Sequence, residues 1–168
     1  PRYIQKRTNS NPERFDQVKT VPTKGVELSD TQKQWIKNVD TFFVGSSSGT
    51  DANARLDVSH RGGNVGFVQV LEDSTLKIPD YKGNSMFNTL GNFAQNPQAG
   101  LLFIDFEQGK TLQLTGKTEL LFEQHSAEDL NKTGGTGRFW TFKTTQWIEI
   151  ENHHKVQWDL MDYSPFNP

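Results

Sequence analysis

Residues 86–116 read MFNTLGNFAQNPQAGLLFIDFEQGKTLQLTG, and this stretch carries the strongest fold signal of the chain. Apolar side chains recur in its first part at intervals of three and four residues, which predicts an amphipathic helix over 86–94. Asn96-Pro97 ends this helix, because proline disfavours helical geometry in the residue before it. Two apolar strands separated by a turn are predicted next, at 101–106 and 111–116.

Short strands are predicted on both sides of that helix. Apolar, β-rich runs bounded by turn residues are typical of strands, and they occur at 41–45, 54–60, 67–71 and 75–78. A final hairpin is expected, with strands over 138–150 and 156–160. Capping patterns predict two more helices, over 30–39 and 126–130. Six or more strands around a central helix predict a mainly-β barrel with helical decoration.

The length of 168 residues suits a single domain. Residues 1–28 are polar and contain prolines, so an irregular N-terminal arm is predicted ahead of a domain over 29–168. Only 33% of the residues are hydrophobic, but 12 Phe and 4 Trp supply rings large enough to fill a small barrel. Such a lean core favours completion by a ligand or a partner subunit.

The composition argues against several functional classes. The chain has no cysteine, which rules out disulfides and thiolate catalysis. Its 18 basic and 20 acidic residues give a net charge of -2, which argues against a nucleic-acid partner. No apolar run approaches the ~18 residues of a membrane span, and the first residues lack the apolar stretch of a secretory signal. A cytoplasmic location is therefore expected.

Residues 57–63, DVSHRGG, form the first candidate site. Glycines let a backbone approach a ligand closely, and the guanidinium of Arg61 is a planar fork of donors that suits phosphate. This strand end therefore predicts a site for an anionic ligand. A glycine-rich hairpin with an exposed arginine is the plainer explanation, and on spacing alone it is slightly favoured.

A second polar cluster lies at the start of the predicted helix and contains Asn84, Ser85 and Asn88. The free amides at a helix N-terminus bind phosphate well. Asn and Ser at such a position more often cap the helix. The two interpretations stay open, but both anion-friendly clusters fall within one part of the predicted barrel.

Taken in order along the chain, these motifs resemble the FMN-binding proteins related to pyridoxamine 5'-phosphate oxidase. The resemblance covers about residues 30–168 and rests on DVSHRGG at 57–63, GFV at 66–68, PDYKGNSMFNTLGN at 79–92, and the runs at 96–97, 100–106, 112–116 and 158–168. It implies a six-stranded split β-barrel that forms a homodimer, with FMN at the subunit interface.

The resemblance also implies which residues contact the cofactor. They lie on the strand around Arg61, at the next strand end, at the helix start and on a later strand that the second subunit is expected to supply. The expected set is Val58, Ser59, His60, Arg61, Ile78, Pro79, Asp80, Asn84, Ser85, Asn88, Thr111 and Gln113.

The sequence departs from the oxidase itself in two places. The oxidase has an Arg-Lys pair at the phosphate-binding helix start, where this chain has Phe87-Asn88-Thr89. The basic substrate motif at the oxidase C-terminus is also absent. Oxidation of pyridoxamine phosphate itself is therefore not expected, and the physiological substrate stays open.

The first functional hypothesis is an FMN-dependent oxidoreductase whose electron donor is a reduced nicotinamide or a partner reductase. Two alternatives stay open: a non-catalytic module that binds or stores FMN, and the same barrel binding a deazaflavin or heme. Heme would need His60 or His125 as an axial ligand. No catalytic acid or base is identified. His60 is the one side chain suggested for proton exchange near neutral pH, and a structural hydrogen-bond donor is an equal alternative for it. The neighbouring His153 and His154 would face opposite ways in a hairpin, so no metal site is expected.

Overall fold

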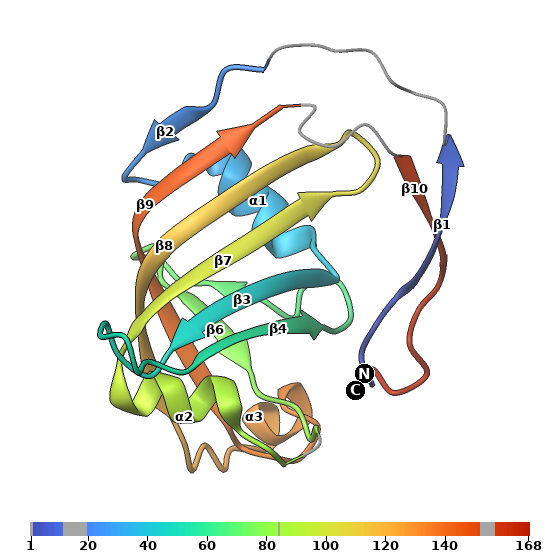
Figure 1. Cartoon of the computed structure of the whole chain (residues 1–168). Coiled ribbons are helices and arrows are strands. Elements are labelled where there is room, and N and C mark those ends of the chain that lie inside the picture. The colour runs from blue at the N-terminus through green and yellow to red at the C-terminus, as the bar shows by residue number, and fades with distance from the viewer. Residues whose placement is uncertain (1, 12–19, 84, 152–156) are drawn as a thin grey trace.

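The computed structural model describes residues 2–11, 20–83, 85–151 and 157–168. In this part of the chain, one antiparallel sheet of eight strands dominates the fold (Figure 1). Its strands follow the order β4-β3-β7-β8-β9-β6-β5, and β2 pairs with β9. They are β2 (Thr23–Gly25), β3 (Thr41–Ser47), β4 (Leu56–Gly62), β5 (Gln69–Val70), β6 (Leu76–Pro79), β7 (Gln98–Asp105), β8 (Lys110–Leu121) and β9 (Phe139–Ile150).

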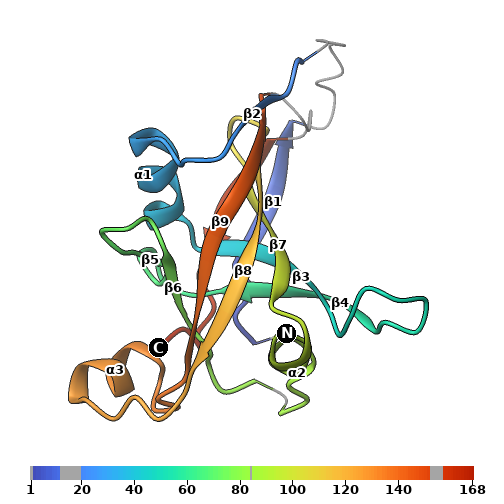
Figure 2. The same ribbon diagram turned by 90° about the vertical axis from the view of Figure 1, so that its left-hand side faces the viewer.

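The sheet curls on itself, so that β3 and β4 run across the direction of β8 and β9 (Figure 2). Aromatic rings fill its interior. The ring of Phe42 lies 5.3 Å from Phe103, and Phe93 lies 5.1 Å from Trp140, with all four side chains buried. The predicted mainly-β split barrel is confirmed, and large aromatic side chains supply its core.

The described residues form three helices, α1 (Asp30–Asn38), α2 (Asn88–Gln95) and α3 (Ala127–Lys132). The predicted capping box of α1 is present, because the Ser29 hydroxyl accepts from the Gln32 amide while the Gln32 side chain accepts from the Ser29 amide. Helix α2 ends with Asn96 as its C-cap, directly before the proline, as predicted. Helices α2 and α3 lie at the other end of the barrel from α1 (Figure 1).

Helix α2 begins later than predicted. The apolar spacing indicates a start at Met86, but the helix starts at Asn88 and its N-cap is Phe87. Phe87 is left-handed, with φ at 50°, and no side chain caps the helix. Of the two expected caps, Ser85 is also left-handed, with φ at 61°, and Asn84 lies outside the described residues. The cap prediction for Ser85 is therefore wrong, because the loop conformation turns it away from that role.

A separate two-stranded ribbon stands beside the sheet and consists of β1 (Lys6–Asn11) and β10 (Gln157–Asp162) (Figure 1). The predicted final hairpin is wrong, because β10 pairs with β1 whereas β9 pairs with β8, β6 and β2. The turn expected at 152–154 lies outside the described residues. Every strand must satisfy its backbone hydrogen bonds, but local sequence does not show which distant strand does so.

Two smaller differences concern the arm and the number of strands. The expectation of irregular structure over the first 28 residues is wrong, since β1 and β2 lie there. Strand β5 keeps only two residues of the run predicted at 67–71, so β2 and β5 are short additions to the six longer strands of the sheet.

Within the described residues, no helix has the length and apolar character needed to cross a bilayer. The division into an arm and one domain stays a prediction.

Candidate functional site

Strand β4 lies at one edge of the sheet, and its side chains alternate between two surfaces. Ser59 and Arg61 stand in register with fully buried residues of β3, so they face the barrel side. Val58 and His60 have the opposite orientation and face outward. One strand therefore contributes to two different surfaces.

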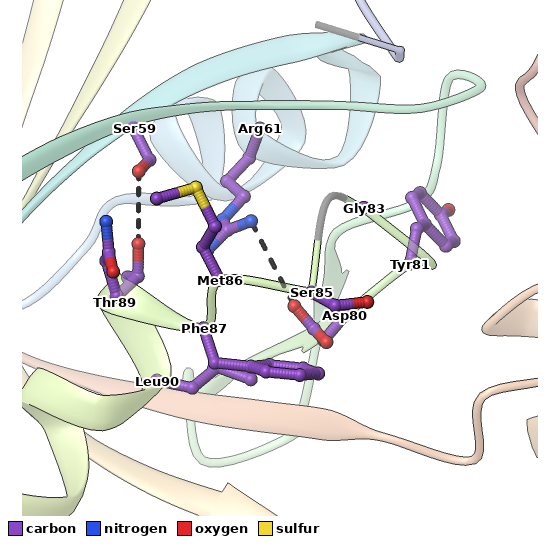
Figure 3. A pocket seen from close by; sticks show the side chains of 11 residues that line it. Ser59, Arg61, Asp80, Tyr81, Gly83, Ser85, Met86, Phe87, Thr89 and Leu90 are labelled. Carbon is purple, nitrogen blue, oxygen red and sulfur yellow. Dashed lines mark hydrogen bonds and ion pairs between the residues drawn. The ribbon is translucent and has the colours of Figure 1, made fainter.

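A small hollow of about 110 Å³ lies between β4, the residues after β6 and the start of α2 (Figure 3). Helix α2 packs against β3 and β4, which brings these distant segments together. Five residues of the expected set line the hollow: Ser59, Arg61, Asp80, Ser85 and Asn88. The structure thus unites the two polar clusters of the sequence in one candidate site.

Arg61 is the cationic group of this small hollow, and a carboxylate holds it on one side (Figure 3). Its Nη1 lies 4.0 Å from Asp80 Oδ1, and Asp80 Oδ2 accepts a 2.9 Å hydrogen bond from Arg138 Nε. Burial lowers the pKa of Arg61, while Asp80 and Asp57 act in the opposite direction. The Nε of Arg61 is buried and has no hydrogen-bond partner among the described residues. Such a donor favours a ligand that can accept a hydrogen bond.

The start of α2 offers a second group of donors. The first amides of a helix have no partner within the helix, and no side chain caps those of α2. Ser85 and Phe87 hold the preceding loop in left-handed conformations, which cost on the order of 1–3 kcal/mol each and cluster at binding sites. Free helix amides beside a buried guanidinium suit an anionic group such as phosphate.

Thr89 and Asp57 belong to the same site, although neither is in the expected set of cofactor contacts and Asp57 was noted only as the first residue of the 57–63 motif. Thr89 Oγ1 donates to Asp57 Oδ2 at 2.6 Å and lies 3.1 Å from Ser59 Oγ, which donates to the same carboxylate oxygen at 2.8 Å. These bonds tie the first turn of α2 to β4. The sequence signal was the spacing of Asp57 and Ser59, because residues two apart on a strand share a face.

A larger hollow of about 730 Å³ lies next to the small one. Ser59, Arg61 and Tyr81 line both, so the two are adjacent. His60 and Pro79, two further residues of the expected set, line the larger hollow. Its volume falls within the roughly 300–1,000 Å³ that is usual for small-molecule sites.

His60 is neutral at pH 7 in this structure. Burial, followed by the positive charge of Arg61, lowers its pKa to about 4. Its ring packs edge-on against Phe43 at 5.7 Å. This lowered pKa disfavours a charged imidazole at neutral pH, and proton exchange by His60 stays a prediction.

Three expected contacts lie on the other surface of the sheet. Val58, Thr111 and Gln113 line a third hollow, of about 590 Å³, on the outward face of β4, β3, β7 and β8. Apolar side chains of Phe43 and Leu102 line it as well. These three residues do not line either hollow beside Arg61 of the same chain.

The remaining residues of the sequence analysis fall elsewhere. The side chain of Ile78 is fully buried in the core, so only its backbone is available to a ligand. His125 is exposed and lines none of the three hollows. Asn84, His153 and His154 lie outside the described residues, and the residues that the structure does describe contain no group of three or more potential metal ligands.

The chain is similar to known proteins in its fold but not in its sequence. No family model matches the chain, and no curated protein matches it. HupZ of Group A Streptococcus matches with a TM-score of 0.53 at 12% identity, over 78% of this chain and 98% of that one. A candidate pyridoxamine 5'-phosphate oxidase of Lactobacillus delbrueckii matches at 0.51 and 16% identity, over 71% and 92% of the two chains. An FAD-binding protein of Mesorhizobium loti matches at 0.50 and 14% identity, over 78% and 98%.

These identities show the fold alone. The chain has the split β-barrel fold of pyridoxamine 5'-phosphate oxidase-like and flavin-binding proteins. Function has to be argued from the site, since one fold hosts several chemistries.

Proposed function

We propose that this protein binds FMN beside Arg61 and acts as an FMN-dependent oxidoreductase. The observation that carries the proposal is the buried Nε of Arg61, which has no hydrogen-bond partner among the described residues, in a side chain that lines a hollow shared with the uncapped start of α2. A phosphate at this position accepts from both groups. It leaves the contact between Arg61 Nη1 and Asp80 in place, because a different nitrogen of the guanidinium is used.

The sizes of the two hollows support the same arrangement. The small hollow suits a compact anionic group, and the adjacent larger hollow has room for a ring system. Ser59, which lines both, is placed to contact the chain that joins phosphate and ring. The flavin supplies the redox chemistry when it is bound, and the protein supplies position and charge.

His60 has a limited role in this proposal. A neutral imidazole at pH 7 offers one donor and one acceptor. It is therefore suited to orient a ligand by hydrogen bonding. The electron donor that we propose is a reduced nicotinamide.

We also propose a homodimer in which the partner subunit contributes Thr111 and Gln113 to the site. The outward sheet face that holds them is rich in apolar side chains, with Leu56 81% exposed and Val58 77% exposed. Exposed apolar patches of this kind mark interaction surfaces. Pairing of two such faces would cover Val58 and carry the outward residues of one chain toward the cofactor of the other.

The first experiment measures the visible absorbance of the purified protein after addition of excess FMN and desalting. The proposal expects a retained flavin band with one FMN per chain. It also expects oxidation of a reduced nicotinamide with multiple turnovers when dioxygen or an added dye accepts the two electrons from the reduced flavin. Retained flavin without turnover would favour a binding or storage module. Absence of retained flavin would contradict the cofactor assignment, and spectra with a deazaflavin or heme would then be recorded on the same sample.

A further inference from the structure

Both terminal segments of the chain reach the larger hollow. Arg2 and Tyr3 from one segment and Phe166 from the other line it together with Arg61. The two segments are tied to each other, since the Ser164 hydroxyl donates to the carbonyl of Arg2 at 2.5 Å. They therefore form a wall of the hollow that neither segment makes alone.

Gln5 holds this wall against the barrel. Its buried side chain donates to the carbonyls of Asp40 at 3.4 Å and Gly63 at 3.3 Å, and its Oε1 accepts from the Ser164 amide at 2.7 Å. One carboxamide thus links the N-terminal segment, the sheet and the C-terminal segment. A buried polar group that is satisfied in this way fixes a unique arrangement.

Gly62 allows the wall to come close. A Cβ at this position would clash with the carbonyl oxygen of Tyr3 and would lie 2.8 Å from the ring of His60. The sequence predicts that the glycines after Arg61 let a ligand approach the backbone, but at Gly62 the group that approaches is the backbone of the N-terminal segment.

Aromatic rings face the hollow from this wall. Tyr3 packs on Tyr81 with ring centroids 5.0 Å apart, and its hydroxyl donates to the carbonyl of Lys82 at 2.9 Å. Phe166 also lines the hollow, although 58% of it is exposed. Rings that line a hollow beside a guanidinium suit a planar ligand that carries negative charge.

We infer that the terminal segments complete the binding site, and that Tyr3, Tyr81 and Phe166 receive a planar heteroaromatic ring. This inference rests on the proposed function, because the ring is either that of the flavin or that of the reduced nicotinamide. The two sources share the same stacking chemistry. If the ring is that of the flavin, the affinity for FMN depends on Tyr3. If it is that of the nicotinamide, the KM for the reduced nicotinamide depends on Tyr3.

The test compares wild type with Tyr3→Ala and Tyr3→Phe in the full chain. Tyr163→Ala is the matched control, since Tyr163 is 43% exposed and does not line the hollow. FMN affinity is measured by fluorescence titration, and kcat and KM for the reduced nicotinamide are measured separately. We expect Tyr3→Ala to weaken one of the two ligands about tenfold, the size of a lost ring stack. Tyr3→Phe should restore wild-type binding, because it keeps the ring.

A second variant tests the wall without removing a ring. Gly62→Ala should displace the N-terminal segment and lower the same affinity, whereas Gly49→Ala, which has open space around it, should not. A change in FMN affinity assigns the wall to the flavin ring, and a change confined to KM assigns it to the nicotinamide ring.

If the protein binds FMN and the folded Tyr3→Ala variant keeps the wild-type FMN affinity and nicotinamide KM, this inference is overturned but the proposed function is not. A wild type that binds neither FMN nor the reduced nicotinamide would overturn it together with the proposed function. If the Gly62→Ala variant does not fold, the Tyr3 variants alone test the inference.

Discussion

The barrel side and the outward side of β4 differ in chemistry, although both are formed by the same seven-residue strand. Ser59 and Arg61 face polar groups of α2 and of the segment after β6. Leu56 and Val58 face outward and have no cover in this structure. The contrast shows that strand alternation can place a ligand site and an interaction face on one element. Each of the following substitutions acts mainly on one of these two sides.

The largest expected effect is on the outward side. Val58→Lys places a charge where the proposed dimer buries an apolar side chain, which should cost about 3 kcal/mol or more in dimer stability. Light scattering should report a monomer, and FMN affinity should fall because the partner residues are lost. Val21→Lys, at a position 83% exposed, is the control and should stay dimeric. A dimeric Val58→Lys protein would remove this face from the interface.

The barrel side is tested by Arg61→Ala. We expect FMN binding to weaken by about 1.5–3 kcal/mol, as for the loss of a charge-assisted hydrogen bond. The dimer should persist, since the guanidinium faces away from the outward surface. Isothermal titration with FMN measures the first effect and light scattering the second. Unchanged FMN affinity would remove Arg61 from the site.

The pH dependence of stability tests His60, which faces outward from β4. The pKa of His60 is lowered from 6.5 to about 4, so between those values the unfolded chain binds more protons than the folded chain. The free energy of unfolding from this group therefore falls as the pH drops from about 6.5 toward 4. Urea unfolding of wild type and His60→Gln across this range should show a weaker pH dependence in the variant. Equal slopes would mean that His60 titrates normally.

Thr89→Val should lower stability by about 1–2 kcal/mol, because it removes one of the hydroxyls that donate to the partly buried Asp57 carboxylate. Urea unfolding measures the loss. Thr75→Val is a matched control, since Thr75 makes the same kind of bond to Asp73 at an exposed turn. A larger loss at Thr75 would contradict the assigned importance of the link between α2 and β4.

The smallest effect is expected for Asn88→Ala. Asn88 is exposed at the first position of α2 and offers the ligand a neutral hydrogen bond, so FMN affinity should fall by about 1 kcal/mol or less. The same titration used for Arg61→Ala measures it. If Asn88 matters more than Arg61, the phosphate lies at a different place in the hollow.

Much of the fold could be predicted from the sequence. The capping box at Ser29 and Gln32 and the stop at Asn96 act within a single turn of the chain, so a short window contains the whole signal. The start of α2 could not be predicted in this way. Apolar spacing continues through Met86 and Phe87, but a left-handed Phe87 ends the helical geometry there.

The candidate site was predictable only in part. Arg61 and Asn88 could be proposed from their residue types, and the structure places them in one hollow. Thr111 and Gln113 lie on another surface, and their approach to the cofactor remains a proposal that needs a second subunit. Tyr3 could not be predicted as a lining residue, because it lies far in the sequence from β4, the strand that it covers.

By itself, the sequence determined the identity of most strands and helices, the aromatic core and the two polar clusters, because each is encoded by neighbouring residues. Only the tertiary structure decided that β10 pairs with β1, that Arg61 Nε has no partner among the described residues, and that the terminal segments close on Gly62. These features depend on which distant groups satisfy each other's hydrogen bonds and fill each other's space. A linear pattern does not contain that information.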